Sequence, residues 1–127
     1  KEDTTKPKKE ELYSTELFEG KKYLNLKNID GKRISVIQLG VTIEYYKGKE
    51  KDTKKIEQKI VPYLRELQQD TIKYFSSITI DEALNKGVTM EKAKKDLIKR
   101  FNKIVPPDEK EKKKTVHNVI FYDWFAQ

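Results

Sequence analysis

Hydrophobic and polar residues alternate most regularly along the stretch Lys32–Tyr46. Successive side chains of a strand point to opposite faces, so this alternation predicts a long, half-buried strand. The apolar face consists of Ile37, Leu39, Val41, Ile43 and Tyr45. Gly40 lies on the other face, where it predicts a β-bulge or the close approach of a neighbouring segment.

A second extended run, Tyr23–Ile29, precedes this strand, and Asp30-Gly31 separates the two. An Asp-Gly pair readily adopts positive φ at both central turn positions, which suits a type I′ turn. We therefore predict a tight antiparallel β-hairpin. The preceding segment Leu12–Gly20 is interpreted as a transition with room for a short helical turn.

After a turn at 47–52, apolar residues recur at steps of three and four between positions 56 and 75, which predicts an amphipathic helix. Asp52 or Thr53 can cap its start. Pro62 removes a backbone hydrogen bond inside this stretch. The helix therefore either kinks at Pro62 or begins its regular part near that residue.

Two further helices are expected between positions 79 and 107. Thr79-Ile-Asp-Glu82 fits a capping box, and the short helix that follows should end at Gly87. Thr89 can cap the next helix, which Pro106-Pro107 would end. The apolar stripe of that helix consists of Met90, Ala93, Leu97, Phe101 and Ile104.

The last segment, Val116–Gln127, follows a charged loop and is rich in β-branched and aromatic residues on both faces. This composition predicts a strand in the middle of the sheet, or one covered on both sides, paired beside the long strand. The order of elements predicts an α+β fold, in which a small antiparallel sheet of the N-terminal hairpin and the C-terminal strand packs with helices. Residues 1–20 are assigned to a charged tail and 21–127 to one domain.

Charge changes the picture of possible partners. The chain of 127 residues carries a net charge of +7, which suggests nucleic acid or an acidic membrane surface. Its only arginines, however, are Arg33, Arg65 and Arg100. Arginine is the residue that reads guanine edges and grips phosphate through two hydrogen bonds. The lysine excess therefore favours a solubilising surface, and nucleic-acid binding remains the alternative.

No group of residues predicts catalysis, a metal site or a cofactor. His117 is the only histidine, and the chain has no cysteine, whereas metal sites and catalytic triads need several partners. Ser76-Ser77 has no base nearby in sequence, and Asp123 is a single carboxylate within an apolar strand. We therefore predict a protein that is not an enzyme.

Candidate protein-interface residues come from two places. One is the strand-end aromatic pair Tyr45 and Tyr46, and the other is the basic helix face at Lys92, Lys95 and Lys99. Aromatic side chains are enriched at protein interfaces. A basic face of this kind is also typical of the solvent-exposed side of an amphipathic helix.

Three stretches together resemble the FliL family of flagellar basal-body proteins. They are Tyr23-Leu24-Asn25-Leu26, Tyr74–Leu84, and the ending Val116-x-x-Val119-x-Phe121-x-Asp123-Trp124-x-x-Gln127. The resemblance covers residues 23–127. The chain departs from the family pattern at Gln68-Gln69, where the family has Arg-Asp, at Gly87, which is out of register, and at Trp124, which replaces a phenylalanine.

The resemblance implies a membrane-anchored, non-enzymatic protein without a cofactor. A transmembrane helix would precede Lys1, and the domain would lie on the periplasmic side of the bacterial inner membrane, at the flagellar basal body. The family's fold is like that of stomatin (band 7, or SPFH). Its members associate with the stator complex of the motor, support torque, and assemble into rings when tethered. The alternative is a lysine-rich nucleic-acid-binding or general adaptor module.

Overall fold

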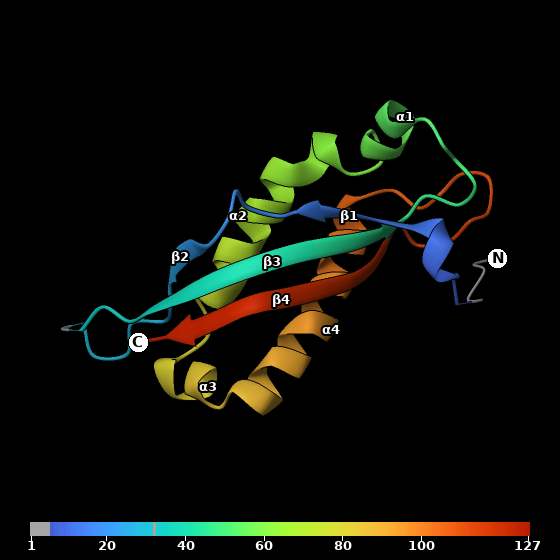
Figure 1. Cartoon of the computed structure of the whole chain (residues 1–127). Coiled ribbons are helices and arrows are strands. Elements are labelled where there is room, and N and C mark those ends of the chain that lie inside the picture. Colours follow the sequence, from blue (N-terminus) through green and yellow to red (C-terminus); the bar gives the residue numbers. More distant parts are fainter. Residues whose placement is uncertain (1–5, 32) are drawn as a thin grey trace.

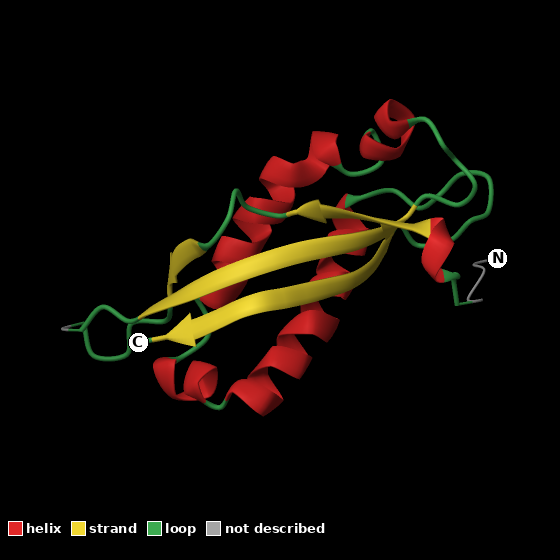
Figure 2. Cartoon of the chain, viewed as in Figure 1, coloured by secondary structure: helices red, strands yellow, loops and turns green. Residues whose placement is uncertain are grey.

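Strand β3 (Val36–Tyr46) is the centre of a four-stranded antiparallel sheet in the computed structural model, which describes residues 6–31 and 33–127. Strand β4 (Val116–Ala126) pairs with one side of β3. Strands β1 (Leu12–Glu16) and β2 (Lys22–Asn25) share its other side. The helices cover one face of this sheet (Figures 1 and 2) and comprise α1 (Thr53–Glu57), α2 (Leu64–Phe75), α3 (Ile80–Leu84) and α4 (Lys86–Ile104).

The alternation along β3 is confirmed. All five apolar residues of the predicted face are fully buried, and they face α2 and α4 within one core cluster. The pairing of β3 with the C-terminal strand is confirmed as well. A register shift follows Gly40, which confirms the predicted irregularity there.

Strand β4 was expected in the middle of the sheet or covered on both sides. Neither is right, since its outward face exposes Tyr122 and Phe125. Within the described ranges it pairs only with β3, because β1 and β2 occupy the other side of the central strand. One edge of β4 is therefore an edge of the sheet. Its apolar residues alternate between the core and the opposite sheet face, which explains why both faces read as apolar in the sequence.

The folded part extends further toward the N-terminus than the assignment of residues 1–20 to a tail predicts. Residues 12–16 form β1, in place of the expected helical turn, and Leu17 and Phe18 after it are buried. Among residues 6–20, the only helical turn is the 3₁₀ turn Lys9–Glu11. Residues 1–5 of the predicted tail lie outside the described residues.

The predicted hairpin is partly right. Strands β2 and β3 pair antiparallel, but a longer loop joins them in place of a two-residue turn. Within this loop, the side chains of Asn28 and Asp30 accept hydrogen bonds from the backbone N–H groups of Gly31 and Arg33. These Asx interactions offer the backbone an alternative to the strand ladder, so the strands stop early.

The predicted helix over 56–75 begins its regular part near Pro62. Asp52 caps α1, residues Val61–Tyr63 form a 3₁₀ turn with the proline at its start, and α2 follows. A proline is tolerated in a first helical turn because the missing N–H would have no partner there.

The capping box of Thr79 and Glu82 is confirmed at the start of α3. The expected stop at Gly87 and cap at Thr89 are wrong. Helix α3 ends before Asn85, and α4 begins at the next residue, so that Gly87 lies inside α4. The Thr89 hydroxyl instead donates to the carbonyl oxygen of Glu82 and ties the two helices together.

The core lies between the sheet and the helices. Its aromatic centre is formed by Phe75 of α2 with Phe121 and Trp124 of β4, whose rings meet edge to face at centroid distances of 5.1–6.2 Å. The Trp124 Nε1 donates to the carbonyl oxygen of Ala83 at 3.0 Å, which joins β4 to α3. The predicted α+β class is confirmed, and the likeness to stomatin stays a prediction.

Candidate protein-interaction site

One face of the sheet points away from the helices (Figure 1). Three aromatic side chains on this face are exposed. Tyr23 of β2 and Phe125 of β4 both lie opposite Gln38 of β3, so they flank it in one row across the sheet. Their exposed fractions are 59% and 55%, and that of Tyr122 is 46%. Exposed aromatic residues gathered on one face are typical of protein interaction sites.

Polar neighbours hold this face in place. The extra residue of the β4 bulge is Tyr122, whose ring lies over Gly40, where a Cβ atom would clash with it. Glu16 of β1 accepts a hydrogen bond from Thr42 at 3.1 Å, and its carboxylate also interacts with the Tyr122 hydroxyl. Burial and this carboxylate raise the pKa of Tyr122 above its usual value.

The charge on this face is acidic, in contrast to the chain as a whole. Among the described residues, the strand positions that share the face with Gln38 carry carboxylates at Glu16, Glu44 and Asp123 and no lysine. The amide of Gln38 donates to Asp123 at 2.6 Å. We call this surface the open sheet face; its residues are Ser14, Glu16, Tyr23, Gln38, Gly40, Thr42, Glu44, Asn118, Ile120, Tyr122, Asp123 and Phe125.

The predicted lysines lie together on the outward side of α4. Residues 92, 95 and 99 follow one another at steps of three and four, opposite the buried Ala93, Leu97 and Phe101. All three lysines are exposed. Lys92 forms an ion pair of 2.6 Å with Asp96. Burial raises the pKa of Asp96, but hydrogen bonds from Lys92 and Tyr74 outweigh it and hold the pKa below its usual value.

The predicted tyrosines lie in the interior, away from these lysines. Tyr45 is 0% exposed and Tyr46 is 1% exposed, so neither presents a ring at the surface. Tyr45 packs edge to face against Tyr13. Burial, followed by the nearby Tyr13 and Glu57, raises the pKa of Tyr45 to about 12. Loops and β1 cover this end of β3. Both tyrosines therefore lack the exposure that an interface role requires.

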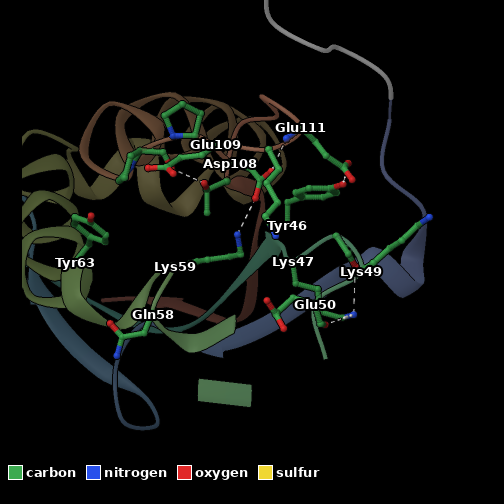
Figure 3. Close-up of a pocket in the computed structure, with 15 residues that line it drawn as sticks. Tyr46, Lys47, Lys49, Glu50, Gln58, Lys59, Tyr63, Asp108, Glu109 and Glu111 are labelled. Carbon is green, nitrogen blue, oxygen red and sulfur yellow. Dashed lines mark hydrogen bonds and ion pairs between the residues drawn. The ribbon is translucent and has the colours of Figure 1, made fainter. Parts of the chain in front are cut away.

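The loops that cover Tyr46 also line a hollow of about 610 Å³ (Figure 3). The Tyr46 hydroxyl donates to Glu111, and Lys59 and Asp108 form an ion pair of 2.7 Å across the hollow. Its volume would suit a small molecule, but such sites are mostly apolar. Here lysines and glutamates dominate the wall, and their contacts join loops, which indicates a structural role.

Comparison with known families decides the identity. The family described as "Flagellar basal body-associated protein FliL" matches residues 19–127. The chain belongs to the FliL family. In a comparison with curated proteins, no sequence matches this chain. The sequence resemblance is thereby confirmed, and the chain is assigned to the flagellar basal body. The open sheet face and α4 lie within the family match except for β1, which precedes it.

A polar seam between α2 and α4 of this FliL-family domain was missed by sequence reasoning. Arg100 donates two hydrogen bonds to Asp70 at 2.7 and 2.8 Å, and its guanidinium lies 5.4 Å from the centre of the Tyr74 ring. The Tyr74 hydroxyl donates to Asp96 at 2.6 Å. The only available signal was that Arg100 is an arginine among lysines, and arginine suits such two-pronged pairing.

Residues 6–31 and 33–127 contain neither a helix that could span a membrane nor a cluster of metal-binding side chains. No helix there has both the length and the apolar composition that a membrane crossing requires. In the same residues, no three histidine or carboxylate side chains gather in a way that could hold a metal ion.

Proposed function

We propose that this domain is a non-enzymatic scaffold that associates with the stator units of the flagellar motor and supports torque generation. Membership of the FliL family supports a role at the basal body. The observation that carries the proposal is the open sheet face, which gathers aromatic residues and excludes lysine in a chain of otherwise lysine-rich surface. Interfaces are enriched in aromatic residues and depleted of lysine in this way.

In this proposal the domain lies on the periplasmic side of the inner membrane, held by a transmembrane helix that precedes it. The charged segment before β1 would be the connection to that helix. Tethered copies would self-associate into a ring around the stator. The lysines at positions 92, 95 and 99 remain proposed contacts, while the buried Tyr45 and Tyr46 are not carried forward.

Co-purification with stator components tests the proposal, using the full-length protein in its native membrane. The variant Tyr23→Ser/Phe125→Ser removes two exposed aromatic residues of the open sheet face. A matched control, Ile29→Ser/Ile34→Ser, removes two exposed apolar residues from the loop between β2 and β3.

We expect the wild type and the control to retain stator components and the sheet-face variant to lose them. If no stator component accompanies even the wild-type protein, the stator assignment is wrong. If both variants retain the stator equally, the open sheet face is not the surface that matters.

A further inference from the structure

We propose that the open sheet face of one copy binds the outward face of α4 of a second copy, so that copies associate head to tail. This inference rests on the proposed function, because it names the partner of the same sheet face. It commits to a second copy of the chain because the two faces match in charge, in apolar content and in length.

The two faces have complementary chemistry. The open sheet face combines the aromatic row of Tyr23 and Phe125 with three carboxylates. The outward face of α4 combines Val88, which is 66% exposed, with a line of lysines. Leu84 at the end of α3 is 61% exposed and precedes this face. Each face therefore carries an apolar end and a charged remainder of opposite sign, the pattern of electrostatically matched interfaces.

The order and spacing of the groups also agree. Along β3, the aromatic row lies at position 38, and the carboxylates lie in the rows of positions 40, 42 and 44. At about 3.4 Å per residue, the carboxylate rows span roughly 14 Å. Along α4, Val88 comes first and the lysines follow from Lys92 to Lys99, roughly 10 Å at 1.5 Å per residue. Long lysine side chains can span the difference.

The positions of the faces dictate the kind of assembly. The sheet is one layer of the fold and α4 lies in the other layer (Figures 1 and 2). The exposed lysines of α4 lie opposite its buried residues, and so away from the core. A copy that binds through one face still offers the other. Such a heterologous contact repeats from copy to copy, and it gives a ring if the rotation closes and a filament if it does not.

A charge exchange between the faces tests the contact. Variant S carries Glu16→Lys and Glu44→Lys on the sheet, and variant H carries Lys95→Glu and Lys99→Glu on the helix. The control Lys54→Glu/Lys55→Glu makes the same change of charge as variant H, at exposed residues of α1. Since Glu16 accepts a hydrogen bond from Thr42 and interacts with Tyr122, a second sheet variant, Ser14→Lys/Glu44→Lys, leaves that residue intact.

The readout is energy transfer between labelled copies held on vesicles by an N-terminal tag, which raises their effective concentration. The chain has no cysteine, so Ser76→Cys supplies a single exposed labelling site. We expect wild type and control to associate, and variants S and H alone to associate about tenfold more weakly. A mixture of S and H should recover, because the reversed sheet face of S then meets the reversed helix face of H, and the native sheet face of H meets the native helix face of S.

Failure of the mixture to recover, or equal weakening of the control, would overturn the head-to-tail contact. If charge exchange has no effect while Tyr23→Ser/Phe125→Ser still abolishes stator co-purification, the open sheet face binds the stator directly. In that case this inference fails and the proposed function stands. If the mixture recovers but no stator component co-purifies, the head-to-tail contact stands and the stator association fails.

Discussion

At the scale of single residues, the position of the Tyr122 ring depends on the absence of a side chain at Gly40. A Cβ atom at this position would come within 2.7 Å of Cδ1 of the Tyr122 ring, so Gly40→Ala must displace that ring. We expect a loss of about 1–2 kcal/mol in the free energy of unfolding. The loss should shrink when Tyr122→Ala is also present. Denaturant titration of the wild type, the two single variants and the double variant measures this.

Gly87→Ala in α4, where a Cβ meets no atom within 4 Å, should instead stabilise the fold by about 0.5–1 kcal/mol.

The ion pair of Lys59 and Asp108 predicts a dependence of stability on pH. Burial raises the pKa of Asp108, but hydrogen bonds from Lys59 and from the Glu111 N–H outweigh it, so the pKa lies below its usual value. A carboxylate whose pKa is lower in the folded state stabilises the fold above the unfolded pKa of about 3.9, and this stability is lost as the pH falls through the folded pKa.

Replacing that carboxylate tests the sign. Asp108→Asn should lower the free energy of unfolding by about 1–3 kcal/mol at pH 7. The difference from wild type should vanish as the pH falls below the folded pKa. Urea titrations that follow the fluorescence of Trp124 at several pH values measure it. The exposed Glu19→Gln serves as a control and should change little. A difference that stays constant down to acid pH would contradict the assignment.

At the scale of elements, β4 is the segment whose loss the fold should tolerate least. It buries Val119, Phe121 and Trp124 against the helices, at roughly 1.5–3 kcal/mol for each fully covered side chain. That sum is comparable to the total stability of about 5–15 kcal/mol for a domain. Deleting residues 119–127 should leave an unfolded or aggregating chain, whereas Phe125→Ser should melt cooperatively. Cooperative melting of the truncated chain by circular dichroism would disprove the prediction.

Element types could be read from the sequence wherever the pattern was long or chemically specific. The alternation over Ile37–Tyr45 predicts a strand because only an extended chain buries all of its apolar residues on one face. The capping box at Thr79 predicts a helix start because it pairs backbone N–H groups that a helix leaves without partners. The errors lie in segments whose secondary structure is decided by long-range contacts. The short segment Leu12–Glu16 has little pattern of its own and becomes a strand because β3 offers it a free side.

The candidate site was predictable only in part for the same reason. A helix periodicity places Lys92, Lys95 and Lys99 on one outward face, and they lie there. No local pattern tells which end of β3 is covered, so Tyr45 and Tyr46 were predicted as interface residues although both are buried. The open sheet face joins residues from four strands, which only the pairing register brings together.

At the scale of the whole molecule, the charge of +7 should not amount to a nucleic-acid site. Most of the cations are lysines, and the open sheet face is acidic. We expect duplex DNA to bind only in the non-specific range of about 10⁻⁴–10⁻⁶ M, or more weakly, at physiological salt. Fluorescence anisotropy with two unrelated duplexes measures this. Nanomolar binding with a base preference would instead support the alternative of a nucleic-acid-binding module.

In the cell, the proposed role makes the output of the flagellar motor depend on this protein. A scaffold that assembles around stator units should matter most when torque is high, because torque depends on the stator units that stay engaged. Loss of the protein should therefore reduce swimming or swarming under load while growth stays normal. Tyr23→Ser/Phe125→Ser in the chromosomal gene should reproduce this loss, and Ile29→Ser/Ile34→Ser should not, since only the first pair lies on the open sheet face. Speed of tethered or swimming cells in media of increasing viscosity measures the effect. Unchanged motility in the null strain at every load, with normal protein levels in the wild type, would show that torque does not depend on this domain.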